Sequence, residues 1–228
     1  MTLGFVGLGE MGGPMARNLG RGHDVRGFDA DADVRAASGV ACVDALGGLA
    51  DVDALILCLP NAQVAEAVLF DSGLAAILAR GTPVIDTSTA AHGATCALAS
   101  RLGSMGLRFM DAPVSGMAAR AVDGTLTMMC GGDAALFAEM EMMLGAMAST
   151  VLHMGDVGAG QLTKLINQLL FDINVAGLAE ILPIAAKLGL PAEPLVLAVL
   201  FGCSMDAGGG VGAHPGAFFF FVFCFVLF

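Results

Sequence analysis

Short β-branched and apolar runs alternate with Ala-, Leu- and Met-rich stretches of helical length from residue 3 to about residue 153. Several of the short runs end at Gly, Pro or Asp, which are residues typical of loops. This alternation is typical of βαβ units, in which helices connect the strands of a parallel sheet. We therefore predict an α/β fold with a mostly parallel sheet. The predicted strands are Leu3–Val6, Asp24–Phe28, Ala54–Leu57, Pro83–Asp86, Leu107–Met110, Thr127–Cys130 and Thr150–Leu152.

The pattern changes after residue 157. A helical stretch from about Gln161 to Leu188 follows, and no strand pattern comes after it. We place a domain boundary here, with residues 1–157 forming the sheet domain and residues 158–228 forming a second, all-helical domain. In the second part, the Gly-rich segment 207–216 is predicted to be a loop, and residues 217–228 form a Phe-rich tail.

Composition excludes some classes of partner. The chain has 10 Lys+Arg against 21 Asp+Glu, and its formal net charge of -11 repels phosphate backbones, so we expect no nucleic-acid binding. Because 57% of the residues are apolar and only 14% are charged, a membrane-anchored protein is an alternative. The apolar run 217–228 is shorter than the roughly 20 residues that a helix needs to cross a bilayer, so we do not expect membrane association.

The N-terminus and the cysteines bear on the compartment. The chain begins a strand-like run at once, without the charged head and apolar core of a signal peptide, so we expect a cytoplasmic protein. The six Cys form no C-x-x-C pair and do not lie at zinc-site spacing from the four His. We expect buried, reduced thiols and no metal site.

A glycine-rich loop, Gly7-Leu8-Gly9-Glu10-Met11-Gly12, follows the first predicted strand and precedes a helix. Its spacing fits the dinucleotide-binding loop of a Rossmann-type sheet. Gly7 would make the tight turn, Gly9 would let the backbone approach a pyrophosphate, and Gly12 would let the helix pack closely on the strand. Because Gly supplies 32 of the 228 residues, a plain turn is the alternative.

Asp29 ends the second predicted strand at the distance, about 20 residues after the first glycine, where a carboxylate accepts hydrogen bonds from an adenosine ribose. A carboxylate there repels a 2′-phosphate, and the following Ala30-Asp31 offers no Arg to neutralise it. We therefore expect NAD rather than NADP. The alternative is that Asp29 is a solvated strand end, with Asp31 and Asp33 in the first turn of a helix.

Lys164 is one of only two lysines and lies just past the predicted domain boundary. On a helix, Lys164, Asn167 and Gln168 share one face, so an ammonium and two amides would point the same way. Burying three such groups without partners would be costly, which favours a site. An exposed strip on a surface helix is the alternative.

The loop Asp111–Gly116 follows another predicted strand. Its Pro and Gly shape a turn in which the Ser115 hydroxyl and backbone N–H groups could hold a carboxylate. No general base lies at a recognisable spacing from Ser115, so we do not expect a serine nucleophile. An ordinary loop is the alternative.

Taken together, these segments resemble the β-hydroxyacid dehydrogenases, the family of 3-hydroxyisobutyrate dehydrogenase and tartronate semialdehyde reductase. Residues 7–19 look like the opening signature of that family, and further segments match in the family's order over about residues 3–200. These segments are Leu59-Pro60, Asp86-Thr87-Ser88-Thr89, Asp111–Gly116 with Gly124–Thr127, and Lys164-x-x-Asn167.

The resemblance implies hydride transfer between NAD and a small 3-hydroxy acid or semialdehyde, with Lys164 as the general acid/base. It also implies substrate contacts and cofactor contacts. Because an uncovered helical half-domain makes a monomer doubtful, we expect a homo-oligomer. The implied substrate residues are Ser115, Gly116, Asn167 and Gln168, and the implied cofactor residues are Gly7, Leu8, Gly9, Glu10, Met11, Gly12, Asp29, Leu59, Pro60, Ser88 and Thr89. A dinucleotide-binding fragment without turnover is the alternative function.

Two features depart from the family pattern. Met117 stands where a second Gly usually follows Ser115-Gly116, and its side chain could crowd the substrate. Family members continue through further helices that carry another Lys, whereas this chain stops in the Phe-rich tail. The resemblance therefore implies a truncated or frame-shifted chain with an incomplete helical domain.

Overall fold

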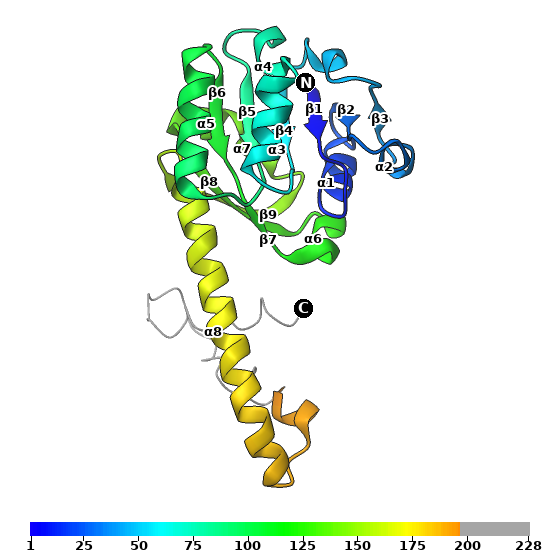
Figure 1. The fold of residues 1–228 in the computed structure, drawn as a ribbon. Helices are drawn as coiled ribbons and strands as arrows, with labels where there is room; N and C mark the ends of the chain where they lie inside the picture. Colours follow the sequence, from blue (N-terminus) through cyan, green and yellow to red (C-terminus); the bar gives the residue numbers. More distant parts are fainter. Residues whose placement is uncertain (197–228) are drawn as a thin grey trace. The chain divides into compact units, whose positions relative to one another are not determined.

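A computed structural model describes residues 1–196. The chain divides into two compact units, Met1–Lys164 and a second unit that begins at Leu165. Within the described residues, the first unit holds a nine-stranded sheet in the order β3-β2-β1-β4-β5-β6-β8-β7, with β9 paired to β8 (Figure 1). The strands are β1 (Thr2–Val6), β2 (Asp24–Phe28), β3 (Ala41–Cys42), β4 (Ala54–Leu57), β5 (Pro83–Asp86), β6 (Arg108–Asp111), β7 (Val114–Ser115), β8 (Leu126–Gly132) and β9 (Ala148–Gly155).

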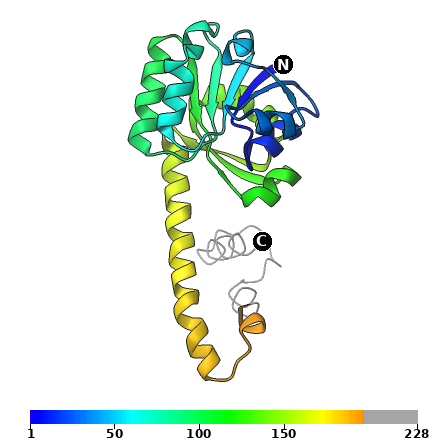
Figure 2. The same ribbon diagram turned by 45° about the vertical axis from the view of Figure 1, so that its right-hand side comes forward.

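Helices connect these strands and cover both faces of the sheet, as Figure 2 also shows. The α-helices are α1 (Gly12–Leu19), α2 (Ala32–Ala37), α3 (Ala62–Glu66), α4 (Leu74–Ile77), α5 (His92–Ser104), α6 (Met117–Asp123), α7 (Ala134–Leu144) and α8 (Ala159–Lys187). A 3-10 turn, η1 (Leu46–Leu49), and a π turn, η2 (Ala67–Asp71), complete the set.

The predicted α/β fold with a mostly parallel sheet is confirmed, and each predicted strand coincides with an observed one. The pairs of β8 with β6 and with β7 are antiparallel. The sequence analysis did not predict β3 and β7, because a two-residue strand is too short to show a period-2 pattern.

Two apolar clusters form the core, one on each face of the sheet. Side chains of α1, α6 and α7 pack on one face, and side chains of η1, α3, α4 and α5 pack on the other. Strand β4 is buried along its whole length, which explains its uninterrupted apolar sequence. The sheet therefore has helical layers on both sides, and its loops lie at the strand ends.

Helix α8 spans Ala159–Lys187, close to the predicted 161–188. By length and composition it could cross a membrane, a test that core helices of soluble proteins also pass. The predicted loop 207–216 and the Phe-rich tail 217–228 lie outside the described residues.

The prediction of buried thiols is wrong for Cys42, which is exposed because both residues of the short edge strand β3 face solvent. Cys130 is buried, and Cys58 and Cys96 are half-buried. Burial raises the pKa of Cys58 to about 11, so it stays a neutral thiol at neutral pH.

Candidate active site

The glycine loop connects β1 to α1, and two of its glycines are sterically required. Gly7 has φ +93°, a left-handed conformation that disfavours other residues, and a Cβ on it would overlap the carbonyl oxygen of Cys58. A Cβ on Gly12 would overlap the carbonyl oxygen of Gly7. A Cβ on Gly9 would meet nothing within 4 Å. The loop is therefore closed toward the sheet at Gly7 and Gly12 and open at Gly9, as a backbone that approaches a pyrophosphate must be.

The carboxylate of Asp29, at the end of β2, anchors this loop. Its Oδ2 accepts a hydrogen bond from the backbone N–H of Leu8 at 2.8 Å, and its Oδ1 accepts one from the N–H of Asp31 at 3.0 Å. The alternative of a merely solvated strand end is therefore wrong, because Asp29 is half-buried and bonded to the loop. Each carboxylate oxygen can accept a second bond, so the group remains suited to ribose hydroxyls.

In the turn after β2, Asp31 has the role that the sequence analysis gives as the alternative, and Arg35 makes contacts that it did not predict. Asp31 caps α2 by accepting a hydrogen bond from the N–H of Asp33 at 2.8 Å, as an acidic residue at a helix start should. Arg35, which sequence reasoning missed, donates from Nη1 to the carbonyl oxygens of Asp29 at 2.6 Å and Ala30 at 3.2 Å. The Arg35 guanidinium therefore lies beside the main chain of Asp29, and its Nη1 donates to two backbone carbonyls.

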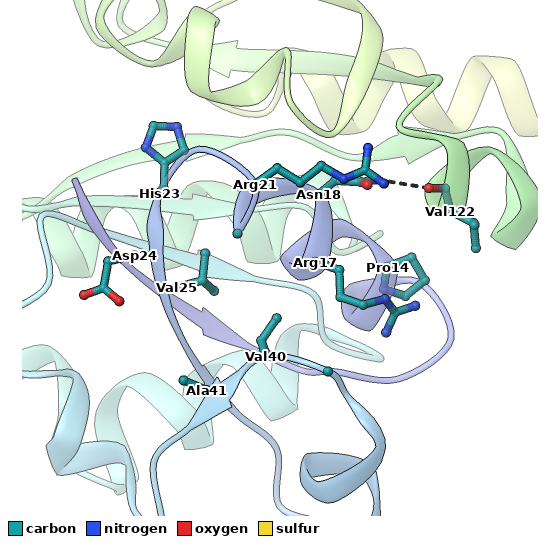
Figure 3. Close-up of a pocket in the computed structure, with 12 residues that line it drawn as sticks. Pro14, Arg17, Asn18, Arg21, His23, Asp24, Val25, Val40, Ala41 and Val122 are labelled. Carbon is teal, nitrogen blue, oxygen red and sulfur yellow. Dashed lines mark hydrogen bonds between the residues drawn. The ribbon is translucent and has the colours of Figure 1, made fainter.

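Two cavities flank α1. One, of about 330 Å³, contains Leu8, Gly9 and Glu10 of the predicted cofactor loop in its lining. The second, of about 530 Å³, lies around the end of α1 and the start of β2 (Figure 3). Its lining includes Arg17, Arg21, His23 and Asp24 and none of the predicted site residues. The smaller cavity therefore belongs with the glycine loop.

A second group of predicted cofactor residues meets at the ends of β4 and β5. The backbone N–H of Leu59 donates to Ser88 Oγ at 2.8 Å, and the N–H of Ser88 donates to Asp86 Oδ1 at 3.0 Å. Ser88 is buried, whereas Pro60 and Thr89 are exposed. The structure therefore brings Leu59 and Ser88 together, with Ser88 holding the Leu59 loop.

Two buried carboxylates sit side by side where β5 and β6 end. Asp86 and Asp111 are register partners on these parallel strands. Burial raises the pKa of Asp86 to about 6, and the neighbouring Asp111 adds to the rise. Burial also raises the pKa of Asp111, whose Oδ1 accepts the N–H of Gly158 at 2.6 Å and whose Oδ2 accepts the N–H of Gln161 at 2.9 Å. Asp111 therefore holds the N-terminus of α8, where a negative charge is favourable.

Lys164 lies one helical turn after Gln161 on α8. It is half-buried, and burial lowers its pKa below the ordinary value of 10.5 because removal from water disfavours the cation. Asn167 is half-buried and Gln168 is exposed; both belong to the second unit. The shift has the direction that a general base requires.

The predicted substrate loop lies at the end of β7. Ser115 pairs with Thr127 of β8 and is half-buried. Gly116 has φ +137° and precedes α6. Met117, at the position where the sequence departs from the family, has φ +62° and is 67% exposed. A non-glycine residue thus occupies the left-handed region where the family pattern has Gly.

Comparison with known proteins shows the family of the chain. Residues 2–155 match the family model of the NAD binding domain of 6-phosphogluconate dehydrogenase. Over 201 residues the chain is 39% identical to 3-hydroxyisobutyrate dehydrogenase of Pseudomonas aeruginosa and 38% identical to 2-(hydroxymethyl)glutarate dehydrogenase of Eubacterium barkeri, covering 86% of this chain and 67% of each relative. The chain belongs to the β-hydroxyacid dehydrogenase family. Its structure also resembles that of Mycobacterium tuberculosis 3-hydroxyisobutyrate dehydrogenase with L-serine, with 35% identity and a TM-score of 0.80 over 95% of this chain and 74% of that one.

Membership in the β-hydroxyacid dehydrogenase family identifies the sheet unit as an NAD-binding domain of the Rossmann type. The glycine loop and Asp29, at the end of β2, both lie within the residues that match this domain. Sequence reasoning did not single out Gln161 or Arg35. A Gln in the first turn of an otherwise apolar helix, one turn before Lys164, was the available signal for Gln161.

Proposed function

We propose that this protein transfers a hydride between NAD and a small 3-hydroxy acid, with a semialdehyde as the oxidised partner. The observation that carries the proposal is the half-buried Lys164, whose pKa burial lowers, on a helix that begins at the NAD-binding sheet. A lysine with a lowered pKa can accept a proton at a pH where an ordinary lysine cannot.

The names of the relatives support the substrate class. Besides the 3-hydroxyisobutyrate dehydrogenases, they include an L-threonate dehydrogenase of Cupriavidus necator at 38% identity and an NAD-dependent L-serine dehydrogenase of Pseudomonas aeruginosa at 37% identity. The acids in these names each carry a hydroxyl group near a carboxylate. We therefore propose a 3-hydroxyisobutyrate-like acid as the substrate, which would give the protein a role in valine degradation.

The residues around the glycine loop fit NAD. The open side of Gly9, the neighbouring cavity and the Asp29 carboxylate support binding of the pyrophosphate and the ribose. When bound, NAD supplies the hydride acceptor. We propose that Leu8, Glu10 and Met11 contribute to the loop. The residues proposed for the remainder of the cofactor are Leu59, Pro60, Ser88 and Thr89.

In this proposal, the residues of the chain transfer one proton and bind the carboxylate of the substrate. We propose that Lys164 in its neutral form takes the proton from the substrate hydroxyl during oxidation and returns it during reduction. Ser115 and Gly116 would hold the substrate carboxylate, and Asn167 and Gln168 would hold its carboxylate and hydroxyl. No residue here need act as a nucleophile, because hydride transfer forms no covalent intermediate with the protein.

Replacement of Lys164 tests this function. Lys164→Ala should lower kcat by about 10²–10⁴-fold, a range typical of a lost general base, and leave the Kd for NADH unchanged. NADH formation from NAD and a panel of 3-hydroxy acids is the assay, and Lys187→Ala, which removes the other lysine at an exposed position of α8, is the matched control. Wild-type turnover in Lys164→Ala would refute the assignment.

The pH profile gives an independent test of the same group. For oxidation the neutral amine is the active form, so kcat should rise with pH through the pKa of Lys164 and level off above it. Because burial lowers this pKa, the rise should be centred below 10.5. A rise centred at or above the ordinary lysine value would contradict the proposed environment.

A second candidate is a dinucleotide-binding chain without turnover. It is supported by the exposed apolar side chains on α8. NADH binding without NADH formation in the wild-type assay would favour this candidate. The same exposed side chains support a homo-oligomer; they include Leu162, Ile166, Leu169 and Ile173.

We propose that the protein works in the cytoplasm as such an oligomer, without a nucleic-acid partner. Sedimentation equilibrium of the purified chain should give a mass above that of the monomer. Because α8 could also cross a membrane by length and composition, recovery of the protein in the membrane fraction would contradict the proposal.

A further inference from the structure

Gln161 makes an unusual set of contacts in the first turn of α8. Its side chain is fully buried, at 0% exposure. Its Oε1 accepts a hydrogen bond from the backbone N–H of Ala90 at 3.0 Å, and its Nε2 donates one to the carbonyl oxygen of Ser88 at 2.7 Å. Its own backbone N–H donates to Asp111. One residue therefore bonds α8 to the segment that follows β5 and to the end of β6.

The two groups bonded by the side-chain amide lie on either side of Thr89. Both are backbone groups, so the amide fixes the main chain of Ser88–Ala90 and leaves the exposed Thr89 between the two bonds. Ser88 in turn accepts the N–H of Leu59. The Gln161 amide therefore holds the main chain of two proposed cofactor residues, Ser88 and Thr89, together with the bond that the Ser88 N–H donates to Asp86.

The same amide lies close to the proposed base. Lys164 follows Gln161 by three residues, which on an α-helix is nearly one turn and a rise of roughly 4.5 Å. No flexible segment separates the two, since both lie within α8. The Ser88–Ala90 segment is thus connected, through Gln161 and the rigid helix, to the turn of α8 that contains Lys164.

We propose that Gln161 is a positioning residue, which sets the register between the Ser88–Ala90 segment and the Lys164 turn of α8. This inference rests on the proposed function, in which the first element lines the cofactor and the second supplies the base. Gln161 acts through its neighbours, because its amide oxygen and one amide proton are already bonded to backbone. Small displacements of reacting groups are costly to rate, so a tether of this kind affects catalysis beyond its effect on stability.

Two variants separate the bonds. Gln161→Met keeps the length of the side chain but loses both bonds, whereas Gln161→Glu keeps an oxygen that accepts the N–H of Ala90 and, in its ionised form, cannot donate to Ser88. We expect Gln161→Met to lower kcat by about 10²-fold, to raise the KM for NAD, and to shift the pH profile toward the ordinary lysine value. Amide exchange at Ala90 should become faster in Gln161→Met and remain slow in Gln161→Glu.

Asn18→Leu is the matched control, because Asn18 is also a buried amide bonded to a backbone carbonyl, that of Ala121 at 2.8 Å. It should lower the Tm without altering the pH profile or the exchange of Ala90. An unchanged KM, pH profile and Ala90 exchange in folded Gln161→Met would overturn the proposal. If the wild-type chain binds NADH but forms none, the proposed function fails. Two measurements on Gln161→Met, the amide exchange of Ala90 and the affinity for NADH, then still decide whether Gln161 positions the Ser88–Ala90 segment.

Discussion

Replacing Asp86 by Asn should stabilise the fold at neutral pH, by an amount that the structure sets. Asp86 is buried beside Asp111, and its pKa rises from 3.8 to about 6. Since one pKa unit corresponds to about 1.4 kcal/mol, this rise costs about 3 kcal/mol of the free energy of unfolding once the carboxyl is ionised. The Asp86→Asn substitution would remove the charge and keep an oxygen that can accept the N–H of Ser88.

The sign follows from proton binding. Between pH 4 and pH 6 the folded state holds a proton on Asp86 that the unfolded state has lost, so the wild-type free energy of unfolding falls as pH rises through this window. Asp86→Asn lacks that fall. Urea unfolding of both proteins at pH 4.5 and pH 7.5 should show a gap that widens by about 2 kcal/mol at the higher pH. A gap of equal size at both pH values would refute the argument that burial of an ionised Asp86 is costly.

Two further substitutions test local features of the fold by urea unfolding. Thr95, in α5, is 1% exposed, and its Oγ1 has no hydrogen-bond partner among the described residues. Thr95→Val should therefore raise the free energy of unfolding by roughly 1–3 kcal/mol. A decrease would mean that the hydroxyl is hydrogen-bonded in the folded protein. Met117→Gly should stabilise by about 1 kcal/mol because it relieves the φ of +62°, whereas the control Met142→Gly, at an exposed site in α7, should destabilise by about the same amount. Equal effects of the two Gly substitutions would argue against strain at Met117.

Much of the fold followed from the sequence because its signals are local. The strands are short apolar runs, and the glycine loop and Asp29 have fixed spacing. The bonds that join them are not local: Gln161 bonds Ala90, which is 71 residues away in the chain. Periodicity describes which face of an element is apolar, not which distant backbone group a polar side chain meets. Hence the sequence offers a signal that Gln161 is unusual but not the identity of the backbone groups that it bonds.

The same contrast applies to Met117. From the sequence it is a side chain in place of a Gly, and crowding of the substrate is the natural concern. In the structure its side chain is mostly exposed and its backbone is left-handed. This departure from the family pattern therefore strains the main chain at Met117, in addition to any steric conflict between its side chain and the substrate.

The residues proposed for the cofactor and some of those proposed for the substrate lie in different units of the chain. The hydrogen bonds that hold the proposed cofactor segments join Leu8 to Asp29 and Gln161 to Ser88–Ala90, and all of these residues belong to Met1–Lys164. Two of the proposed substrate residues, Asn167 and Gln168, lie beyond that unit. NADH affinity should therefore depend on contacts inside the first unit, whereas kcat depends in addition on the helix beyond Lys164. A variant that lost NADH affinity through a change confined to Asn167 or Gln168 would contradict this division.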